Sequence, residues 1–207
     1  RSFLIAAGLS DILGYIKALR FTPDALRYLK GLHIFSDEFL RYLARFRFSG
    51  DIWAMPEGTV FFPGEPVVRV TAPIMEAQMI EGFLLNTINL QTMIASKAAR
   101  VVQAAAGRQV FDFSLRRTHG ADASVKVARS SYLAGFNGTS NVLAGRLYGI
   151  GLSGTMAHSF VMAFGSEIEA FRAYARVFGS RTILLVDTFD LWEGVRNAVR
   201  TGREMER

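Results

Sequence analysis

Four clusters of polar residues in the second half of the chain each follow a short apolar run. The side chains in these clusters that could do chemistry are Phe113, Arg116, Thr139, Ser140, His158, Asp187 and Asp190. An aromatic face can stack on a flat substrate, and a guanidinium can bind a carboxylate or a phosphate through two hydrogen bonds. Hydroxyl, imidazole and carboxylate groups can bind a substrate or stabilise charge that develops during a reaction. This combination of side chains indicates an enzyme.

The apolar runs before these clusters are typical of β-strands at residues 109–113, 132–136, 149–153 and 181–186. The stretches between them have about the length of a crossover helix, so strand, polar tip and helix alternate. This order predicts an α/β fold, an irregular TIM-like β/α barrel with its chemistry at the carboxyl ends of parallel strands. A barrel of this kind needs about eight strands, so we expect only its first half in this chain.

The amino-terminal third has shorter periodic segments. Helix starts are expected at Ser10, Thr22 and Ser36, because each of these capping residues is followed by an acidic residue or a proline. Residues 51–74 change to a strand-like period with proline and glycine punctuation. This part therefore predicts three short amphipathic helices and then a small β-meander.

A long stretch without proline follows, over residues 75–106. Its helical period predicts two helices that meet near residues 86–89. We therefore expect an α+β domain over residues 1–108, incomplete at its start, packed against a barrel domain over residues 109–207.

Composition limits the class of protein. The chain has 207 residues, of which 50% are apolar, and this is ample for a packed core. It contains no cysteine, which excludes disulfides and thiolate metal sites and fits a reducing compartment, so we expect a cytoplasmic protein. The amino end shows neither an initiator methionine nor a signal peptide, so we expect an interior piece of a longer chain.

The distribution of charge bears on partners. The net charge of +6 is spread along the chain rather than gathered in a basic run with interleaved aromatics. We therefore expect no nucleic-acid partner, and a phosphorylated small substrate explains the charge equally well. Residues 147–166 carry no Asp, Glu, Lys or Arg, but glycines and His158 interrupt them, so we expect no membrane insertion.

Several motifs, taken in order, resemble the nicotinate phosphoribosyltransferase family. The matching segments are residues 76–78, 95–100, 113–120, 135–145, 153–159 and 186–190. The resemblance implies a type II phosphoribosyltransferase, with an irregular β/α barrel packed on an α/β domain, that works as a homodimer. It also implies that nicotinate is joined to 5-phosphoribosyl-1-pyrophosphate (PRPP), with Mg²⁺ present and ATP hydrolysis coupled to turnover.

The resemblance assigns four residues to the pyridine substrate. Phe113 would stack on the pyridine ring, and Arg116 would meet the carboxylate or a phosphate. Thr139 is placed with them in substrate binding, and Ser140 favours nicotinate because the nicotinamide enzymes carry an aspartate there. The residues alone leave other uses open. Phe113 could fill the core, Arg116 and its neighbour Arg117 could be surface charges, and Ser140 could cap the following helix.

The resemblance assigns the remaining three residues to phosphate and ribose chemistry. His158 would be phosphorylated by ATP, and Asp187 would lie near the ribose and stabilise the positive charge that grows at its anomeric carbon. Asp190 is the companion of Asp187, although both acids could instead form a helix N-cap and an acidic first turn. No protein metal site is expected, because Mg²⁺ would come with PRPP and ATP and would neutralise the pyrophosphate leaving group.

Other functions remain open from the sequence. The alternatives are a nicotinamide or quinolinate phosphoribosyltransferase and a non-catalytic relative that binds a nucleotide or a partner. Ser140 argues against the nicotinamide enzyme, and the motif around His158 argues against the quinolinate enzyme. The chain lacks the later strands with their phosphate-binding loops, so we expect it to be inactive alone.

Overall fold

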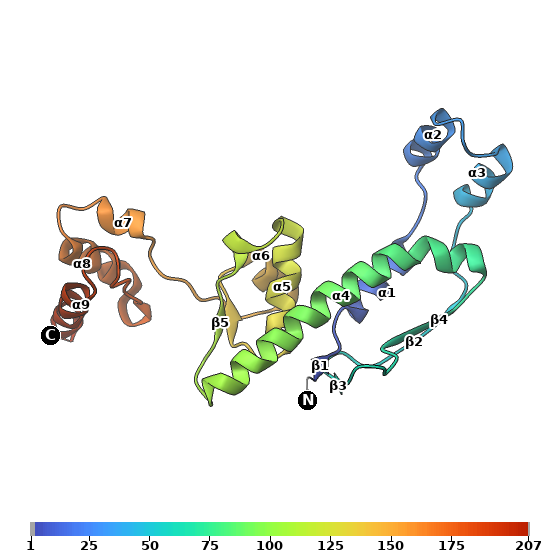
Figure 1. Ribbon diagram of the computed structural model, residues 1–207. Helices are drawn as coiled ribbons and strands as arrows, with labels where there is room; N and C mark the ends of the chain where they lie inside the picture. The colour runs from blue at the N-terminus through green and yellow to red at the C-terminus, as the bar shows by residue number, and fades with distance from the viewer. Residues whose placement is uncertain (1–2, 207) are drawn as a thin grey trace. The chain divides into compact units, whose positions relative to one another are not determined.

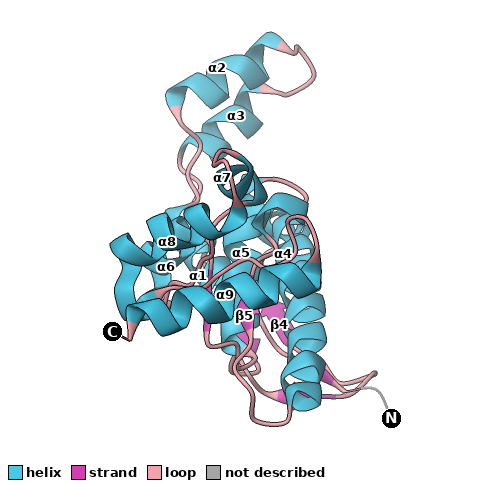
Figure 2. Ribbon diagram, turned by 90° about the vertical axis from the view of Figure 1, so that its left-hand side faces the viewer, coloured by secondary structure: helices cyan, strands magenta, loops and turns pink. Residues whose placement is uncertain are grey.

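The computed structural model describes residues 3–206. The chain forms two compact units that divide between Gly151 and Leu152. Helices predominate in both, as Figure 2 shows, and short strands occur in the first. The fold is therefore mixed α/β. Among the described residues, no helix has both the length and the apolar character needed to cross a bilayer.

The three short amino-terminal helices are confirmed, but the start expected at Ser10 is wrong, because the first helix begins at Leu9 after Gly8 and has no side-chain cap. They are α1 (Leu9–Ala18), α2 (Pro23–Gly31) and α3 (Asp37–Ala44). Thr22 Oγ1 accepts a hydrogen bond from the backbone N–H of Ala25, and Ser36 Oγ accepts one from Phe39, each at 3.2 Å. These two caps satisfy donors that have no partner inside a helix, which is why the helices begin there.

The predicted β-meander is wrong, because its middle strand pairs elsewhere. The strands are β1 (Leu4–Ile5), β2 (Asp51–Ala54), β3 (Val60–Phe61) and β4 (Val68–Thr71). The strand β2 pairs antiparallel with β4, whereas β3 pairs antiparallel with β1. The turn at Gly58 directs the chain toward the amino-terminal strand, since its N–H donates to the carbonyl of Ala6 at 2.8 Å.

Residues 74–105 form one helix rather than the predicted two. This helix, α4 (Ile74–Ala105), passes α1 and then α5 in Figure 1. Its interior contains no proline, and a single glycine such as Gly82 costs only about 1 kcal/mol in a helix. Packing of α1 and α5 along its sides outweighs that cost, so the asparagines at residues 86 and 89 do not break it.

The second half of the first unit holds one parallel strand pair. The elements are β5 (Phe111–Asp112), α5 (Ala121–Leu133), β6 (Gly138–Thr139) and α6 (Val142–Tyr148), with a 3₁₀ turn at Leu115–Arg117. Phe111 is opposite Gly138 and Asp112 is opposite Thr139. On the far side of β6, Thr139 donates its N–H to the carbonyl of Gly151 at 3.0 Å. The chain at Gly151 therefore lies beside β6, although the strand predicted at residues 149–153 is not formed among the described residues.

The strand predicted at residues 132–136 is wrong. Tyr132 and Leu133 are the end of α5, and Gly135 takes a positive φ of 107° to turn the chain out of the helix. The strand begins at Gly138 instead. A Cβ at this glycine would lie 2.5 Å from the carbonyl oxygen of Gly151, so only glycine permits the neighbouring chain to approach.

The second unit is built from helices over one apolar core. The helices are α7 (His158–Met162), α8 (Glu167–Phe178) and α9 (Leu191–Met205). Met156, Val161 and Phe171 are buried in the core, and residues 184–186 pack against it. The strand predicted at 181–186 is not present among the described residues, where a 3₁₀ turn at Gly179–Arg181 leads into a segment without regular secondary structure.

The structure thus confirms the mixed α/β class but not the barrel geometry. Of the parallel sheet predicted for a half-barrel, the described residues contain the pair β5–β6 and the adjoining carbonyl of Gly151. The other predicted strands are replaced by helix in one case and by unpaired chain in another. A parallel strand is recognised only beside its partner, and the partners of a barrel are distant in sequence.

Candidate functional site

The parallel pair β5–β6 brings two predicted substrate residues together. Phe113 follows Asp112, and Ser140 follows Thr139, so both lie one residue beyond the paired positions. The N–H of Ser140 donates to the carbonyl of Asp112 at 2.9 Å, which extends the ladder to this point. Phe113 is 49% exposed, so it does not fill the core and its ring is accessible. The two strand ends therefore present an aromatic face and a hydroxyl residue side by side.

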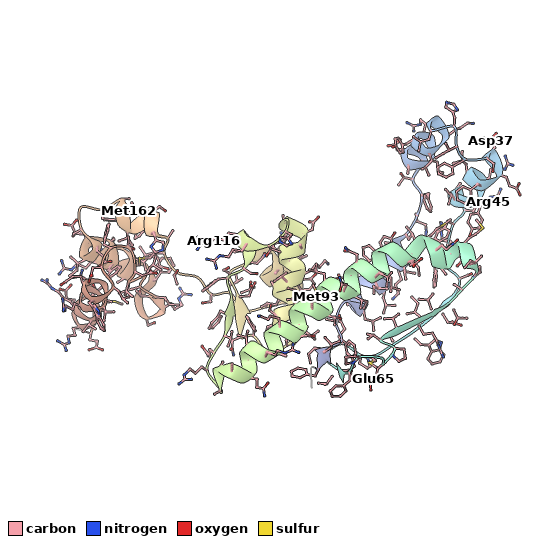
Figure 3. All side chains as sticks on the ribbon, in the orientation of Figure 1. Asp37, Arg45, Glu65, Met93, Arg116 and Met162 are labelled. Atoms are coloured by element: carbon pink, nitrogen blue, oxygen red, sulfur yellow. The ribbon has the colours of Figure 1, made fainter. Side chains whose placement is uncertain are left out.

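Arg116 lies on the 3₁₀ turn that follows β5 and extends into solvent in Figure 3. The turn is closed by the N–H of Arg117 and the hydroxyl of Thr118, which donate to the carbonyl of Ser114 at 2.8 and 2.9 Å. Within residues 3–206, neither Arg116 nor Arg117 forms an ion pair. A guanidinium on a closed turn beside Phe113 is suited to bind an anionic group.

Thr139 lies beneath this surface rather than on it. Its side chain is 1% exposed, and its hydroxyl donates to Asp112 Oδ2 at 2.8 Å. Thr139 Oγ1 also accepts from the N–H of Asn141 at 3.0 Å. Sequence reasoning missed Asp112. A charged residue inside the apolar run 109–113 was the available signal, since a buried carboxylate requires partners.

The helix after β6 is capped by Asn141. Asn141 Oδ1 accepts from the N–H of Ala144 at 3.0 Å, and Asn141 Nδ2 donates to Ser124 Oγ at 3.1 Å. The capping alternative for Ser140 is therefore wrong, because the next residue performs that task. The hydroxyl of Ser140 is left at the strand end beside Phe113.

His158 and the acidic loop are neighbours within the second unit. His158 is the first residue of α7 and is exposed, and its Nδ1 lies 3.3 Å from Thr188 Oγ1. Thr188 belongs to the loop that contains Asp187 and Asp190. Asp187 is exposed, while Asp190 Oδ1 accepts from the N–H of Glu193 at 2.9 Å and caps α9. The capping alternative is confirmed for Asp190.

A metal ion bound near these residues would take most of its ligands from water or from the substrate. The described part of the chain contains no group of three or more His, Asp or Glu side chains that could hold one. Mg²⁺ commonly keeps several waters and binds through one or two carboxylates together with substrate phosphates. The exposed carboxylate of Asp187 suits that limited role.

Two ion pairs hold α5, the helix that follows the Arg116 turn, on the amino-terminal region. Arg129 donates to Glu57 Oε2 at 2.6 Å, and Lys126 Nζ lies 2.7 Å from Asp11 Oδ1. Burial alone would raise the pKa of Glu57, but hydrogen bonds from Arg129 and from the N–H of Gly8 outweigh it, so this pKa lies below its ordinary value. Burial opposes the charge on Lys126 too, yet its bond to Asp11 raises its pKa.

Comparisons with known proteins agree on one family. Residues 1–89 match the nicotinate phosphoribosyltransferase (NAPRTase) N-terminal domain, and residues 108–201 match the nicotinate phosphoribosyltransferase (NAPRTase) family. The chain belongs to the nicotinate phosphoribosyltransferase family. One relative in it is nicotinate phosphoribosyltransferase pncB2 of Mycobacterium tuberculosis, 58% identical over 99% of this chain and 44% of the relative. The Bacillus subtilis nicotinate phosphoribosyltransferase is 40% identical over 98% of this chain and 41% of its own length.

Solved structures agree with this family. Human nicotinic acid phosphoribosyltransferase superposes with a TM-score of 0.87 at 28% identity, over 99% of this chain and 51% of that one. A nicotinate-nucleotide pyrophosphorylase from Pyrococcus furiosus gives 0.73 at 25% identity, over 97% and 44%. The chain thus spans about half the length of these members of the nicotinate phosphoribosyltransferase family and their structural neighbours.

Proposed function

We propose that this chain serves an ATP-dependent nicotinate phosphoribosyltransferase, which joins nicotinate to PRPP and gives nicotinate mononucleotide and pyrophosphate in NAD biosynthesis. The family match carries the proposal, because two models of one family cover residues 1–89 and 108–201. The geometry supports it, because the predicted site residues gather in two groups, one in each compact unit.

The first group would bind nicotinate. Phe113 stacks on the pyridine ring, Arg116 binds the carboxylate, and Ser140 offers a hydroxyl where an aspartate would repel that carboxylate. The pyridine nitrogen then forms a bond to the anomeric carbon of PRPP as the bond from that carbon to pyrophosphate breaks. Positive charge grows on the ribose in this step. The exposed half of Phe113 and the free guanidinium support these roles.

The second group would handle phosphate and ribose. His158 accepts the terminal phosphoryl group of ATP, releasing ADP, and the added negative charge changes how the neighbouring loop binds pyrophosphate. Asp187 stabilises the charge at the anomeric carbon, with Asp190 beside it. Mg²⁺ enters with PRPP and ATP, bound to their phosphates. The contact between His158 and Thr188 supports this grouping.

The remaining expectations belong to the same proposal. The chain forms an α+β domain to about residue 108 and then the first half of an irregular β/α barrel, with site residues at the carboxyl ends of its strands. The parallel pair β5–β6 supports such a barrel. The enzyme works as a cytoplasmic homodimer on small molecules, without nucleic-acid or membrane partners.

The test exposes the full-length protein to ATP labelled in its terminal phosphate and maps the labelled residue. We expect label on His158, none in His158→Gln, and unchanged labelling in His33→Gln, whose histidine is exposed between α2 and α3. Label on another residue would refute the assignment of His158. Turnover measured with nicotinate, nicotinamide and quinolinate decides between the related transferases. Tight nicotinate binding without label or turnover would identify a non-catalytic relative.

A further inference from the structure

Asp112 is a buried acid at the end of β5, and both of its carboxylate oxygens have partners. It is 5% exposed. Oδ2 accepts from the hydroxyl of Thr139 at 2.8 Å, and Oδ1 accepts from the N–H of Ser114 at 3.0 Å. A carboxylate removed from water is destabilising unless hydrogen bonds replace its solvation. These two bonds provide that replacement, and each reaches a different strand end.

The bonds continue from Thr139 into the loop after β6. Thr139 Oγ1 accepts from the N–H of Asn141, and Asn141 Nδ2 donates to Ser124 Oγ in α5. Ser124 Oγ in turn donates to the carbonyl of Ala121 at 2.6 Å. The chain of bonds therefore connects the loop after β5, the loop after β6 and the first turn of α5.

We propose that Asp112 is a positioning residue that fixes the distance between Arg116 and Ser140, and so determines selectivity for a pyridine carboxylate. The inference rests on the proposed function. Ser114 begins the turn that carries Arg116, and Thr139 precedes Ser140. The side chain of Asp112 therefore connects the two segments, in addition to the backbone hydrogen bonds between the strands. The guanidinium and the hydroxyl then meet the two ends of a small rigid ligand without first being ordered.

A catalytic role for Asp112 does not fit this geometry. Its side chain is almost wholly buried, and each oxygen already accepts a hydrogen bond from the protein. A group in this state does not touch a substrate. Its effect must pass through the two loops, so it should appear in binding and selectivity more than in the chemical step.

The experiment uses full-length protein and three variants. Thr139→Val keeps the shape but removes the hydroxyl, and it should raise the KM for nicotinate about tenfold and lower the nicotinate-to-nicotinamide selectivity by a similar factor. Thr139→Ser restores the hydroxyl and should recover most of that loss. Asp112→Asn can still accept from Ser114 and donate to Thr139, so its KM for nicotinate should rise by less than about threefold.

A matched control separates positioning from general loosening. Thr92 lies in α4, and its buried hydroxyl donates to the carbonyl of Ala7 at 3.4 Å. Thr92→Val removes this hydroxyl from the same unit. It should leave KM and selectivity unchanged. Hydrogen exchange in α5, read by mass spectrometry, reports whether the first unit of each variant is folded.

Three outcomes would overturn the inference. Selectivity unchanged in Thr139→Val would show that the bond has no positioning role. If Thr139→Val and Thr92→Val lowered kcat/KM equally, and for both substrates alike, the effect would be purely structural. Loss of kcat in Asp112→Asn with KM unchanged would make Asp112 catalytic. Failure of the parent protein to turn over nicotinate would refute the proposed function instead, and is seen before any variant is compared.

Discussion

The two compact units hold their predicted site residues in different ways. In the first unit, Phe113 and Ser140 follow strands joined by backbone hydrogen bonds and by the buried pair Asp112–Thr139. In the second unit, His158 and Asp187 are exposed on a helix start and a loop, and His158 Nδ1 lies 3.3 Å from Thr188 Oγ1. Hydrogen bonds fix the candidate residues of the first unit, whereas those of the second unit are exposed.

This difference suits the two tasks in the proposed function. A flat, rigid ligand is selected best by groups that are already in place, because ordering them on binding reduces affinity. A histidine that gains and loses a phosphoryl group changes the charge around it in every cycle. Its surroundings must adapt to both states, and an exposed loop can do so more readily than a hydrogen-bonded strand end.

The largest effect is expected from a substitution at Gly194, which should disrupt the packing of the second unit. A Cβ there would lie 2.0 Å from the carbonyl oxygen of Val186, in the segment that leads to Asp187. Gly194→Ala should therefore lower the stability of this unit by about 3 kcal/mol and free residues 182–190 for hydrogen exchange. Hydrogen exchange read by mass spectrometry measures both units separately.

Gly202→Ala is the matched control in the same helix, because nothing lies within 4 Å of a Cβ at that position. It should stabilise α9 by about 1 kcal/mol or less, as alanine usually does in a helix. Faster exchange in α5 of Gly194→Ala would contradict the idea that the two units are stabilised separately.

A smaller effect is expected in the first unit, from its partly buried ion pair. The side chains of Arg129 and Glu57 are 17% and 15% exposed, whereas those of Arg172 and Glu204 in the second unit are 37% and 41% exposed. Glu57→Gln leaves Arg129 without its charge partner and should cost about 2 kcal/mol, measured by hydrogen exchange in α5. Glu204→Gln should leave the second unit unchanged within error.

The contribution of Glu57 to stability should depend on pH in a definite direction. The pKa of Glu57 lies below its ordinary value of 4.5, so the ionised form is favoured by folding. Its contribution is present above pH 4.5 and is lost as the pH falls through the lowered pKa. The parent and Glu57→Gln should therefore differ at neutral pH and converge in acid. A constant difference down to acid pH would show that the charge of Glu57 is not what stabilises α5.

Local signals made much of the amino-terminal region predictable. Thr22 and Ser36 cap the helices that the sequence assigns to them, because a cap acts within one turn. The pairing of β3 with β1 was not predictable in this way, since the partners are more than fifty residues apart. The ion pair of Glu57 with Arg129 spans a similar distance and leaves no local trace.

The candidate site was predictable in its residues more than in its geometry. The apolar run that ends at Phe136 belongs to a helix end and a turn, because Gly135 reverses the chain three residues before the strand. The burial of Thr139 and the role of Asn141 as the cap depend on the partner strand and on Ser124, which only the folded chain brings near. Asp112 was visible as an acid in an apolar run, but its partners were not.

The smallest effect is expected from Thr188→Val in the second unit, which can be set beside Thr139→Val in the first. Thr188→Val removes the hydroxyl near His158, just as Thr139→Val removes the one bonded to Asp112. The Thr188 contact is exposed and long, so its loss should cost about 0.5 kcal/mol and slow labelling of His158 by about twofold. The Thr139 hydroxyl bonds to two buried partners, so its removal should cost several times more free energy of unfolding than removal of the Thr188 hydroxyl. Equal effects of the two variants would mean that the second unit holds its histidine as firmly as the first holds its strand ends.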